Sequence, residues 1–406
     1  MKTFKKYYVV DNVIIGSNHV INNAGAINLI QQFDTLPTEI SVYGDKNHLD
    51  SIRSKIKSIP GKTINYQPIK VIDPAINPFK KIVSWISKLR EDRSFVYQLF
   101  KKSSQENPEL ILFCTITAIN LFRFIHLFNA QNNRKILIGL HGEIEFLFRN
   151  NSSLKNRLNA YFYKKAFAIS GYNVKFLVLS PLIRTKLIQS GLVNERQIVC
   201  VEHPINEASR TLTDIPTKRL IFAQLGVASK RKNSQVIFDL ALRFKEQIGN
   251  SQLAFGIIGK VAPDTEPYVN EYVEISSREG KPLDQKDYEK LIMKAKYSLS
   301  FITGEDYVFR ISGSIMDSIQ YQLPIIALRH EFITDLFQQA GDVGFICEDL
   351  TELESTIQKI IDGDSLCTER YQNQVFNLKL YASRFYDVNN VIFFKKNLAV
   401  SGWTFA

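Results

Sequence analysis

The segment from Arg310 to Asp317 carries residue types that suit the binding of a phosphate group. Ser312, Gly313 and Ser314 open an apolar helical pattern, and the free amides and dipole of a helix N-terminus attract anions. Gly313 lets a phosphate approach the backbone, and Arg310 can donate a charged hydrogen bond. Asp317 lies one turn farther along, where its carboxylate can accept from ribose hydroxyls. The pattern predicts a nucleotide-diphosphate site, although a Ser-Gly-Ser segment can also be an ordinary cap that binds nothing.

A second cationic segment follows an apolar strand pattern at residues 220–225. Gly226 opens this loop, and Lys230, Arg231 and Lys232 end it before a predicted helix. Cations at the carboxyl end of a strand can neutralise the charge that develops on a departing diphosphate. We therefore predict that these four residues bind the same ligand as the first segment. The alternative is a solvated basic loop that has no ligand.

A histidine and a glutamate follow another apolar strand pattern, at residues 135–140. His141 can donate to a sugar hydroxyl or move a proton, and both roles suit an imidazole near neutral pH. Glu143 can orient this histidine or act as a base. We predict both as catalytic residues; the alternative is a histidine that makes a structural hydrogen bond at the edge of a cleft.

The loop after the first predicted strand is rich in glycine and asparagine. It runs from Gly16 into a helix and lacks the G-x-G-x-x-G spacing of a dinucleotide-binding loop. Asn22, Asn23 and Gly25 are predicted to bind an acceptor, with a simple chain turn as the alternative.

Neither a metal nor an organic cofactor is expected. The four cysteines lie far apart and the six histidines are scattered, so no ligand cluster or disulfide framework is indicated, and a reducing cytosol fits. Asp362 and Asp364 resemble a metal-binding D-x-D motif, but they follow a predicted helix outside the expected cleft and are interpreted as a turn.

Short apolar strands alternate with helical patterns along the chain, which is typical of parallel sheets covered on both faces. A polar stretch with two prolines at residues 203–217 interrupts the alternation, which then restarts. We therefore expect an α/β protein of two doubly wound, Rossmann-like domains that face a central cleft, with ligand at the carboxyl ends of the strands. The expected boundaries are 1–205, 206–385 and a C-terminal helix at 386–406 that crosses back to the first domain.

Charge is divided unevenly over the 406 residues. Residues 1–200 hold 28 Lys and Arg against 13 Asp and Glu, whereas the remainder holds 23 against 27. A basic face attracts phosphate-bearing surfaces. No run approaches the about 20 apolar residues of a spanning helix, and no nucleic-acid-binding motif is present. Nucleic acid is therefore not expected as a partner.

Two predicted helices, at residues 77–90 and 153–167, combine basic, apolar and aromatic residues. This composition suits a helix that lies on anionic lipid. The alternative for each is an ordinary core-facing helix with long lysine side chains on its flanks. Together with the basic charge of the first half, they predict a peripheral membrane surface.

These residues together resemble the GT-B glycosyltransferases, in particular the large retaining group that builds bacterial polysaccharides. The resemblance covers residues 218–363 best. It rests on the basic glycine loop at 226–232, on Asp317 followed by Gln322-Leu-Pro-Ile-Ile-Ala327, and on a Gly-rich segment at 341–350. The family pattern has two glutamates separated by seven residues; here Asp317 takes the second position and Phe309 the first. Glu305 or Asp306 could substitute for the missing acid.

The resemblance implies a hexosyltransferase that needs no metal. Its donor would be a UDP- or GDP-linked sugar, and its acceptor a glycan or a lipid-diphosphate-linked glycan at the cytoplasmic face of the cell membrane. The product would be a surface polysaccharide such as lipopolysaccharide or capsule. Two alternatives stay open: a nucleotide-sugar epimerase of the same fold, and an interaction protein that has lost catalysis, which Phe309 makes conceivable.

Overall fold

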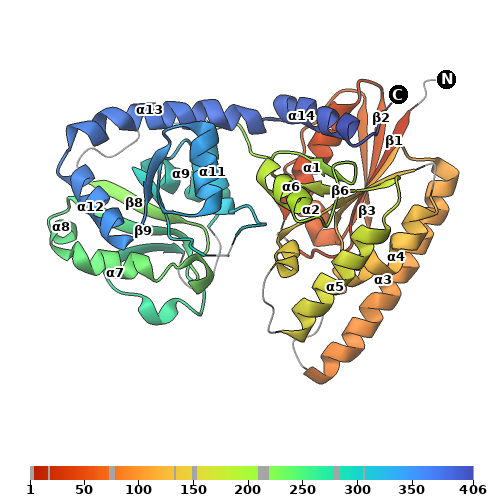
Figure 1. The fold of residues 1–406 in the computed structure, drawn as a ribbon, viewed down its shortest axis with the longest axis horizontal. Coiled ribbons are helices and arrows are strands. Elements are labelled where there is room, and N and C mark those ends of the chain that lie inside the picture. The colour runs from red at the N-terminus through yellow and green to blue at the C-terminus, as the bar shows by residue number, and fades with distance from the viewer. Residues whose placement is uncertain are drawn as a thin grey trace. The chain divides into compact units, whose positions relative to one another are not determined.

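The computed structural model describes residues 4–16, 19–72, 78–131, 134–148, 153–208, 219–277, 283–304 and 307–405, and it does not describe the side chains of residues 78–82 and 143. Within these ranges the chain forms two parallel sheets flanked by helices, as expected for an α/β protein (Figure 1). The chain divides into two compact units, one of residues 1–204 with 387–406 and one of residues 205–386. Among the described residues, no helix combines the length and apolar composition needed to cross a membrane.

The first unit is built on a seven-stranded parallel sheet with the order β3-β2-β1-β4-β5-β6-β7. Its strands are β1 (Lys5–Asp11), β2 (Thr38–Gly44), β3 (Lys62–Pro68), β4 (Leu110–Thr115), β5 (Lys135–Gly139), β6 (Val174–Val178) and β7 (Ile198–Cys200). Its helices are α1 (Val20–Phe33), α2 (Lys46–Arg53), α3 (Pro78–Glu106), α4 (Ala118–Asn129), η1 (Gly142–Leu147), α5 (Leu154–Ile169), α6 (Pro181–Gln189) and α14 (Asp387–Val400).

Alternate residues of these strands face two different helical layers, because successive side chains of a strand point to opposite faces. Tyr7 and Val9 pack with α1, α2 and α14 in one core. Phe113 packs against Phe128 of α4 on the other face, which α3, α4 and α5 cover (Figure 1). The central strands are buried on both sides, and this burial explains their continuous apolar sequences.

The second unit is built on a six-stranded parallel sheet with the order β10-β9-β8-β11-β12-β13. Its strands are β8 (Leu220–Leu225), β9 (Leu253–Lys260), β10 (Val273–Ser277), β11 (Tyr297–Ser300), β12 (Ile325–Leu328) and β13 (Gly344–Cys347). Its helices are η3 (Lys230–Lys232), α7 (Val236–Arg243), α8 (Lys245–Gly249), η4 (Glu266–Tyr268), α9 (Gln285–Lys294), α10 (Gly313–Gln320), α11 (Glu331–Ala340), α12 (Leu350–Ile361), α13 (Ser365–Ala382) and η5 (Ser383–Phe385).

Helices α7 and α12 cover one face of this sheet, and α9, α10 and α11 cover the other. Strand β12 is entirely buried, as its apolar sequence predicts. Asp362 follows the end of α12 and Asp364 caps α13 by accepting from the amide of Cys367, so both belong to a turn between helices.

Candidate functional site

Each sheet has one point where the strand order reverses direction. In the first unit the chain leaves β1 toward β2 and β3 and then continues on the other side at β4; in the second unit the same reversal occurs between β8 and β11. Helices on opposite faces diverge at such a point, so the carboxyl ends of the two strands border the usual ligand crevice of a doubly wound sheet. The predicted residues concentrate at these two edges.

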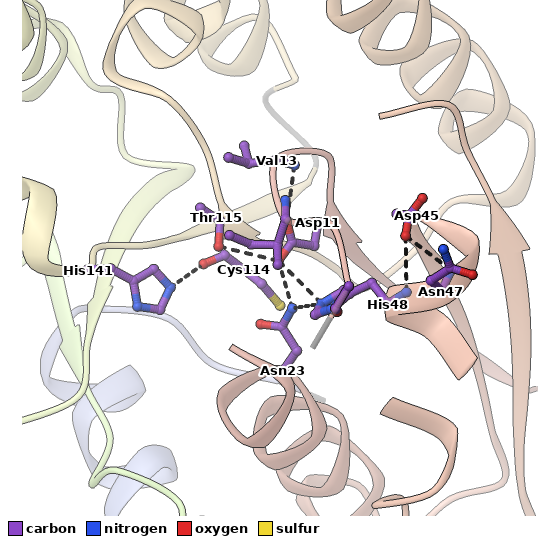
Figure 2. Close-up of polar contacts among 11 residues, drawn as sticks. Asp11, Val13, Asn23, Asp45, Asn47, His48, Cys114, Thr115 and His141 are labelled. Carbon is purple, nitrogen blue, oxygen red and sulfur yellow. Dashed lines mark hydrogen bonds and ion pairs between the residues drawn. The ribbon is translucent and has the colours of Figure 1, made fainter. Parts of the chain in front are cut away.

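Asp11 ends β1 at the reversal point of the first unit and is 3 % exposed. Its Oδ1 accepts from the backbone amides of Val13 at 3.1 Å and Ile14 at 2.9 Å. Its Oδ2 accepts from Nδ2 of Asn23 at 2.6 Å and from Oγ1 of Thr115, at the end of β4, at 3.4 Å (Figure 2). The carboxylate is therefore fully used inside the protein and shapes the loop that follows β1.

Three imidazoles gather near the carboxyl ends of β5 and β7. His141 follows β5, and its Nε2 lies 2.8 Å from the carbonyl oxygen of Cys114 (Figure 2). The ring of His19 meets the His141 ring edge-on, with 4.8 Å between the centroids. Burial, together with its neighbours His141 and His19, lowers the pKa of His203 to about 4, against a hydrogen bond to the carbonyl oxygen of Pro204 that raises it. If Nε2 of His141 carries the proton that this carbonyl bond requires, Nδ1 remains as an acceptor for a ligand hydroxyl.

The residues predicted to bind an acceptor have different surroundings. Asn22 and Gly25 line a small apolar cavity of about 30 Å³. A Cβ atom on Gly25 would lie 2.3 Å from Cβ of Pro204, so this glycine permits close packing. Asn23 is buried, and its side-chain amide contacts Asp11 and His48 within the protein. The side chain of Glu143 lies outside the described part of the chain.

At the reversal point of the second unit, the glycine loop folds tightly after β8. Gly226 has a φ of 75°, in the left-handed region that favours glycine. A Cβ atom on the neighbouring Gly259 would lie 2.0 Å from the carbonyl oxygen of Gly226. Nζ of Lys232 lies 3.7 Å from the position that a Cβ atom on Gly226 would take. Two glycines thus let the loop fold close to β9, with one lysine beside it.

The three cations of this loop have different environments. The ammonium of Lys230 lies 5.3 Å from the ring centre of Tyr268, and the guanidinium of Arg231 lies 5.2 Å from that of Tyr307. Burial lowers the pKa of Lys232 to about 8, although the charge of Asp317 opposes this shift. Lys232 is therefore the cation that this loop places beside Asp317.

Asp317 lies in α10, and its Oδ2 accepts from the hydroxyl of Tyr288, on α9, at 2.6 Å. Burial raises the pKa of Asp317 to about 6, against the hydrogen bond from Tyr288 and the charge of Lys232, both of which lower it. One carboxylate oxygen is thus held by the protein, which leaves Oδ1 as the acceptor for a ligand. Burial, and then the charge of Asp317, raise the pKa of Tyr288, which keeps it a donor.

The N-terminus of α10 completes this edge. Ser312 caps the helix without a side-chain hydrogen bond to its amides, and its hydroxyl instead lies 2.8 Å from that of Ser314. A Cβ atom on Gly313 would meet nothing within 4 Å, so the backbone is open there. Arg310 is partly buried two residues before the cap, and Phe309 is buried. Glu305 and Asp306 lie outside the described residues.

Positive and negative groups of the second unit therefore meet at one edge: Lys232, an open helix N-terminus and the half-used carboxylate of Asp317. A diphosphate suits the first two, and a hydroxyl-bearing ring such as ribose suits the third. Within the described ranges, no group of three or more His, Cys, Asp or Glu residues is placed to hold a metal ion.

Sequence reasoning missed several residues that the tertiary structure places at these edges. Tyr288 belongs to an ordinary amphipathic helix, and nothing near it in sequence points to Asp317. His203 falls in a stretch that reads as a linker. Asp11 ends an apolar strand, and this was the one available signal, because polar residues at the carboxyl ends of such strands tend to face ligands.

Comparison with known proteins shows the fold. No protein-family model matches the sequence, and a search of curated proteins found no match. Among solved structures, the protein TarM matches with a TM-score of 0.65 at 11 % identity, over 99 % of each chain. The pneumococcal O-GlcNAc transferase GtfA, in complex with UDP and GlcNAc, matches at 0.60 and 12 %, over 99 % of this chain and all of the other. The lipopolysaccharide outer core galactosyltransferase WaaB matches at 0.60 and 12 %, over 97 % and 99 %.

These similarities extend over nearly the whole of each chain. The sequence identities are too low to carry a substrate or a reaction from one protein to another. By its two doubly wound domains and the structures that it resembles, the chain has the GT-B fold of glycosyltransferases such as WaaB and GtfA.

Proposed function

We propose that this protein is a glycosyltransferase that moves a sugar from a nucleotide-diphosphate donor to a glycan or lipid-linked glycan acceptor. The observation that carries the proposal is the meeting of Lys232, Asp317 and the open N-terminus of α10 at the reversal point of the second sheet. Such an edge offers one cation, free backbone amides and one carboxylate oxygen. These are the groups that the diphosphate and ribose of a UDP- or GDP-sugar need.

In this proposal the leaving diphosphate is stabilised without a metal. Lys232 and the amides of α10 lie where negative charge would grow as the bond to the sugar breaks, and preorganised donors of this kind stabilise such charge strongly. Asp317 accepts from the ribose through Oδ1, while Tyr288 holds Oδ2. His141 contacts the transferred sugar or assists proton movement, with Glu143 as a further candidate. Ser312, Ser314 and Arg310 supply additional donors to the phosphates.

Thermal-shift and calorimetric titration with UDP, GDP, ADP and CMP tests this assignment. One nucleoside diphosphate should stabilise the protein, and Lys232→Ala and Asp317→Ala should each weaken its binding about 10- to 100-fold, the cost of a charge-assisted hydrogen bond. Lys290→Ala is a matched control, because this exposed lysine lies on the same unit with 72 % of its side chain accessible. Equal binding in all four proteins would overturn the donor site.

Donor hydrolysis and transfer assays then separate a transferase from the alternatives. Incubating the protein with the sugar conjugate of the best nucleotide should release nucleotide slowly in water and faster with an acceptor glycan. Conversion of the donor sugar without release of nucleotide would indicate an epimerase. Binding without any turnover would indicate an interaction protein, consistent with Phe309 at the position of an acid.

The acceptor is proposed to reach the protein at an anionic membrane surface on the cytoplasmic side. Helix α5 supports this placement because it contains no acidic residue and exposes Leu154, Leu158 and Tyr161. Lys155, Arg157, Lys164 and Lys165 surround this apolar stripe and are exposed as well. Apolar residues ringed by cations suit insertion among anionic headgroups.

Helix α3 contributes Val83, Trp85 and Ile86, which are 65, 46 and 44 % exposed. Lys88 lies in the helix 77–90 that the sequence assigns to a lipid surface, and for this residue the assignment is wrong, because its side chain is buried and donates to the carbonyl oxygen of Asn12. It also pairs with Asp92 at 3.5 Å, as a helix side chain can do with the residue one turn ahead. The structure does not describe the side chains of Lys80 and Lys81, which lie in the same helix.

Sedimentation with vesicles that contain phosphatidylglycerol tests the surface. Leu158→Ser combined with Lys164→Glu and Lys165→Glu should reduce binding at least tenfold, since each basic residue near such a surface contributes about 1 kcal/mol. Lys395→Glu with Lys396→Glu provides a control of similar charge change on α14. Unchanged binding of the α5 variant would remove α5 from the surface.

A further inference from the structure

His48 lies within the first unit with no solvent exposure, although it is a polar residue on the short helix α2. Its two ring nitrogens bridge two different segments. Nε2 lies 2.8 Å from Nδ2 of Asn23, on α1, and Nδ1 lies 2.7 Å from the carbonyl oxygen of Gly16. Figure 2 shows this ring between α1 and the chain that follows β1.

Counting hydrogens assigns a role to every atom of this contact. Asp11 accepts four hydrogen bonds, so its carboxylate serves only as an acceptor. Nδ2 of Asn23 therefore donates one hydrogen to Asp11 and its second to Nε2 of His48. Nε2 must then carry no proton, which places the ring proton on Nδ1, where it donates to Gly16. The network requires neutral His48 in one tautomer.

This network holds the loop after β1 from several sides. Asp11 fixes its beginning through the amides of Val13 and Ile14, and His48 fixes the carbonyl group of Gly16. Helix α3 adds a third attachment, since Lys88 donates to the carbonyl oxygen of Asn12 at 3.2 Å. The loop itself lies at the reversal point of the sheet, where a ligand of the first unit is expected.

We propose that Asn23 and His48 are positioning residues that hold residues 12–16, which follow β1, in the geometry needed to bind the acceptor. The inference rests on the proposed transferase function and deepens it, because it replaces the prediction that Asn23 touches the acceptor. The pair acts on the backbone of residues 12–16. Asn23 contacts both Asp11 and His48, and His48 holds the carbonyl group of Gly16. Neither side chain has a hydrogen to spare for a ligand.

Protonation of His48 breaks the arrangement in a specific way. A second ring proton on Nε2 would face the hydrogens of Asn23, and both partners would then be donors. The charged group that faces this nitrogen is Asp11 of β1, whose Oδ2 lies 3.8 Å away. Asp45, at the N-terminus of α2, is already used by the amides of Asn47 and His48. The network therefore has no place for a second proton on this ring.

Transfer kinetics on the full chain test the role. His48→Phe keeps the ring volume but removes both nitrogens, and it should raise the KM for the acceptor or lower kcat at least tenfold. Nucleotide affinity should stay within twofold, because Lys232 and Asp317 belong to the other unit. His48→Gln offers both an acceptor and a donor, so it should recover part of the rate that His48→Phe loses. His126→Gln, at an exposed position on α4, is the matched control.

Hydrogen–deuterium exchange provides a readout that needs no substrate and no folded His48→Phe variant. Exchange in the peptide that covers residues 12–16, corrected for intrinsic rates and measured at pH 7, should be faster in Asn23→Ala than in the wild type and unchanged in His126→Gln. Unchanged exchange in Asn23→Ala, or acceptor kinetics of His48→Phe equal to wild type, would overturn the inference. Absence of transfer together with faster exchange in Asn23→Ala would instead refute the proposed function alone.

Discussion

Raising the pH from 7 to 10 should weaken nucleoside diphosphate binding by removing the charge of Lys232. Burial lowers the pKa of this lysine to about 8 in the unbound protein, whereas the ordinary value is about 10.4. A bound diphosphate favours the charged ammonium and raises its pKa again. Each pH unit above 8 then costs up to about tenfold in affinity, because the ligand must first bring back one proton.

The full effect between pH 8 and pH 10 would be about 100-fold, or about 3 kcal/mol. Lys232 is only partly shielded from solvent, so we expect about 10- to 30-fold. Isothermal titration calorimetry at several pH values measures the affinity directly. Lys232→Arg is the control, since a guanidinium stays charged over this range.

Ionisations of the nucleotide itself are the same for both proteins, so the ratio of their affinities isolates the lysine. A ratio that stays within twofold from pH 7 to pH 10 would refute the reasoning. It would mean that Lys232 lies outside the binding site, or that its buried environment does not penalise the charge.

Three further predictions concern the second unit. Gly259→Ala should lower the free energy of unfolding, measured in urea, by more than about 3 kcal/mol. The φ of Gly259 is 149°, and a Cβ atom there would lie 2.0 Å from the carbonyl oxygen of Gly226, so both oppose a side chain. A loss below about 1 kcal/mol would contradict this. Gly313→Ala should leave stability unchanged or raise it by up to about 1 kcal/mol, since the site is open, yet weaken calorimetric nucleotide binding at least tenfold; undiminished binding would exclude contact of phosphate with this backbone. Asp317→Asn should be about 1–2 kcal/mol more stable than wild type at pH 7 but not at pH 4. Burial raises the folded-state pKa of Asp317 to about 6. The protonated carboxyl group therefore adds to the folding stability of the wild type at low pH, and this stabilisation is lost as the pH rises through 6. Equal stability differences at both pH values would show that the charged carboxylate of Asp317 does not destabilise the folded protein.

The alternation of strands and helices could be predicted where burial makes the sequence uniform. Strand β4 is buried at every position, so its apolar run by itself predicts a strand. The sequence does not mark the edge strands β3 and β10 in this way, because one side of each lacks a partner strand and polar residues are tolerated there. Helix α13 was also missed: Phe376 and Leu380 are exposed on it, which blurs the periodicity that marks a helix.

The sequence alone predicted the residue types of the candidate site in the second unit, because glycine turns, helix caps and clustered cations are local signals. Lys232 and Asp317 each stood in such a pattern, far apart along the chain. Only the neighbouring placement of β8 and β11 brings them together, and only the packing of α9 beside α10 adds Tyr288. The role of His48 was equally invisible, since the partners of its two ring nitrogens come from separate segments. Local periodicity depends on residues that are close in sequence, so it can be recognised from the sequence. The proximity of distant side chains depends on which strands pair, and the pairing is determined only when the whole sheet forms.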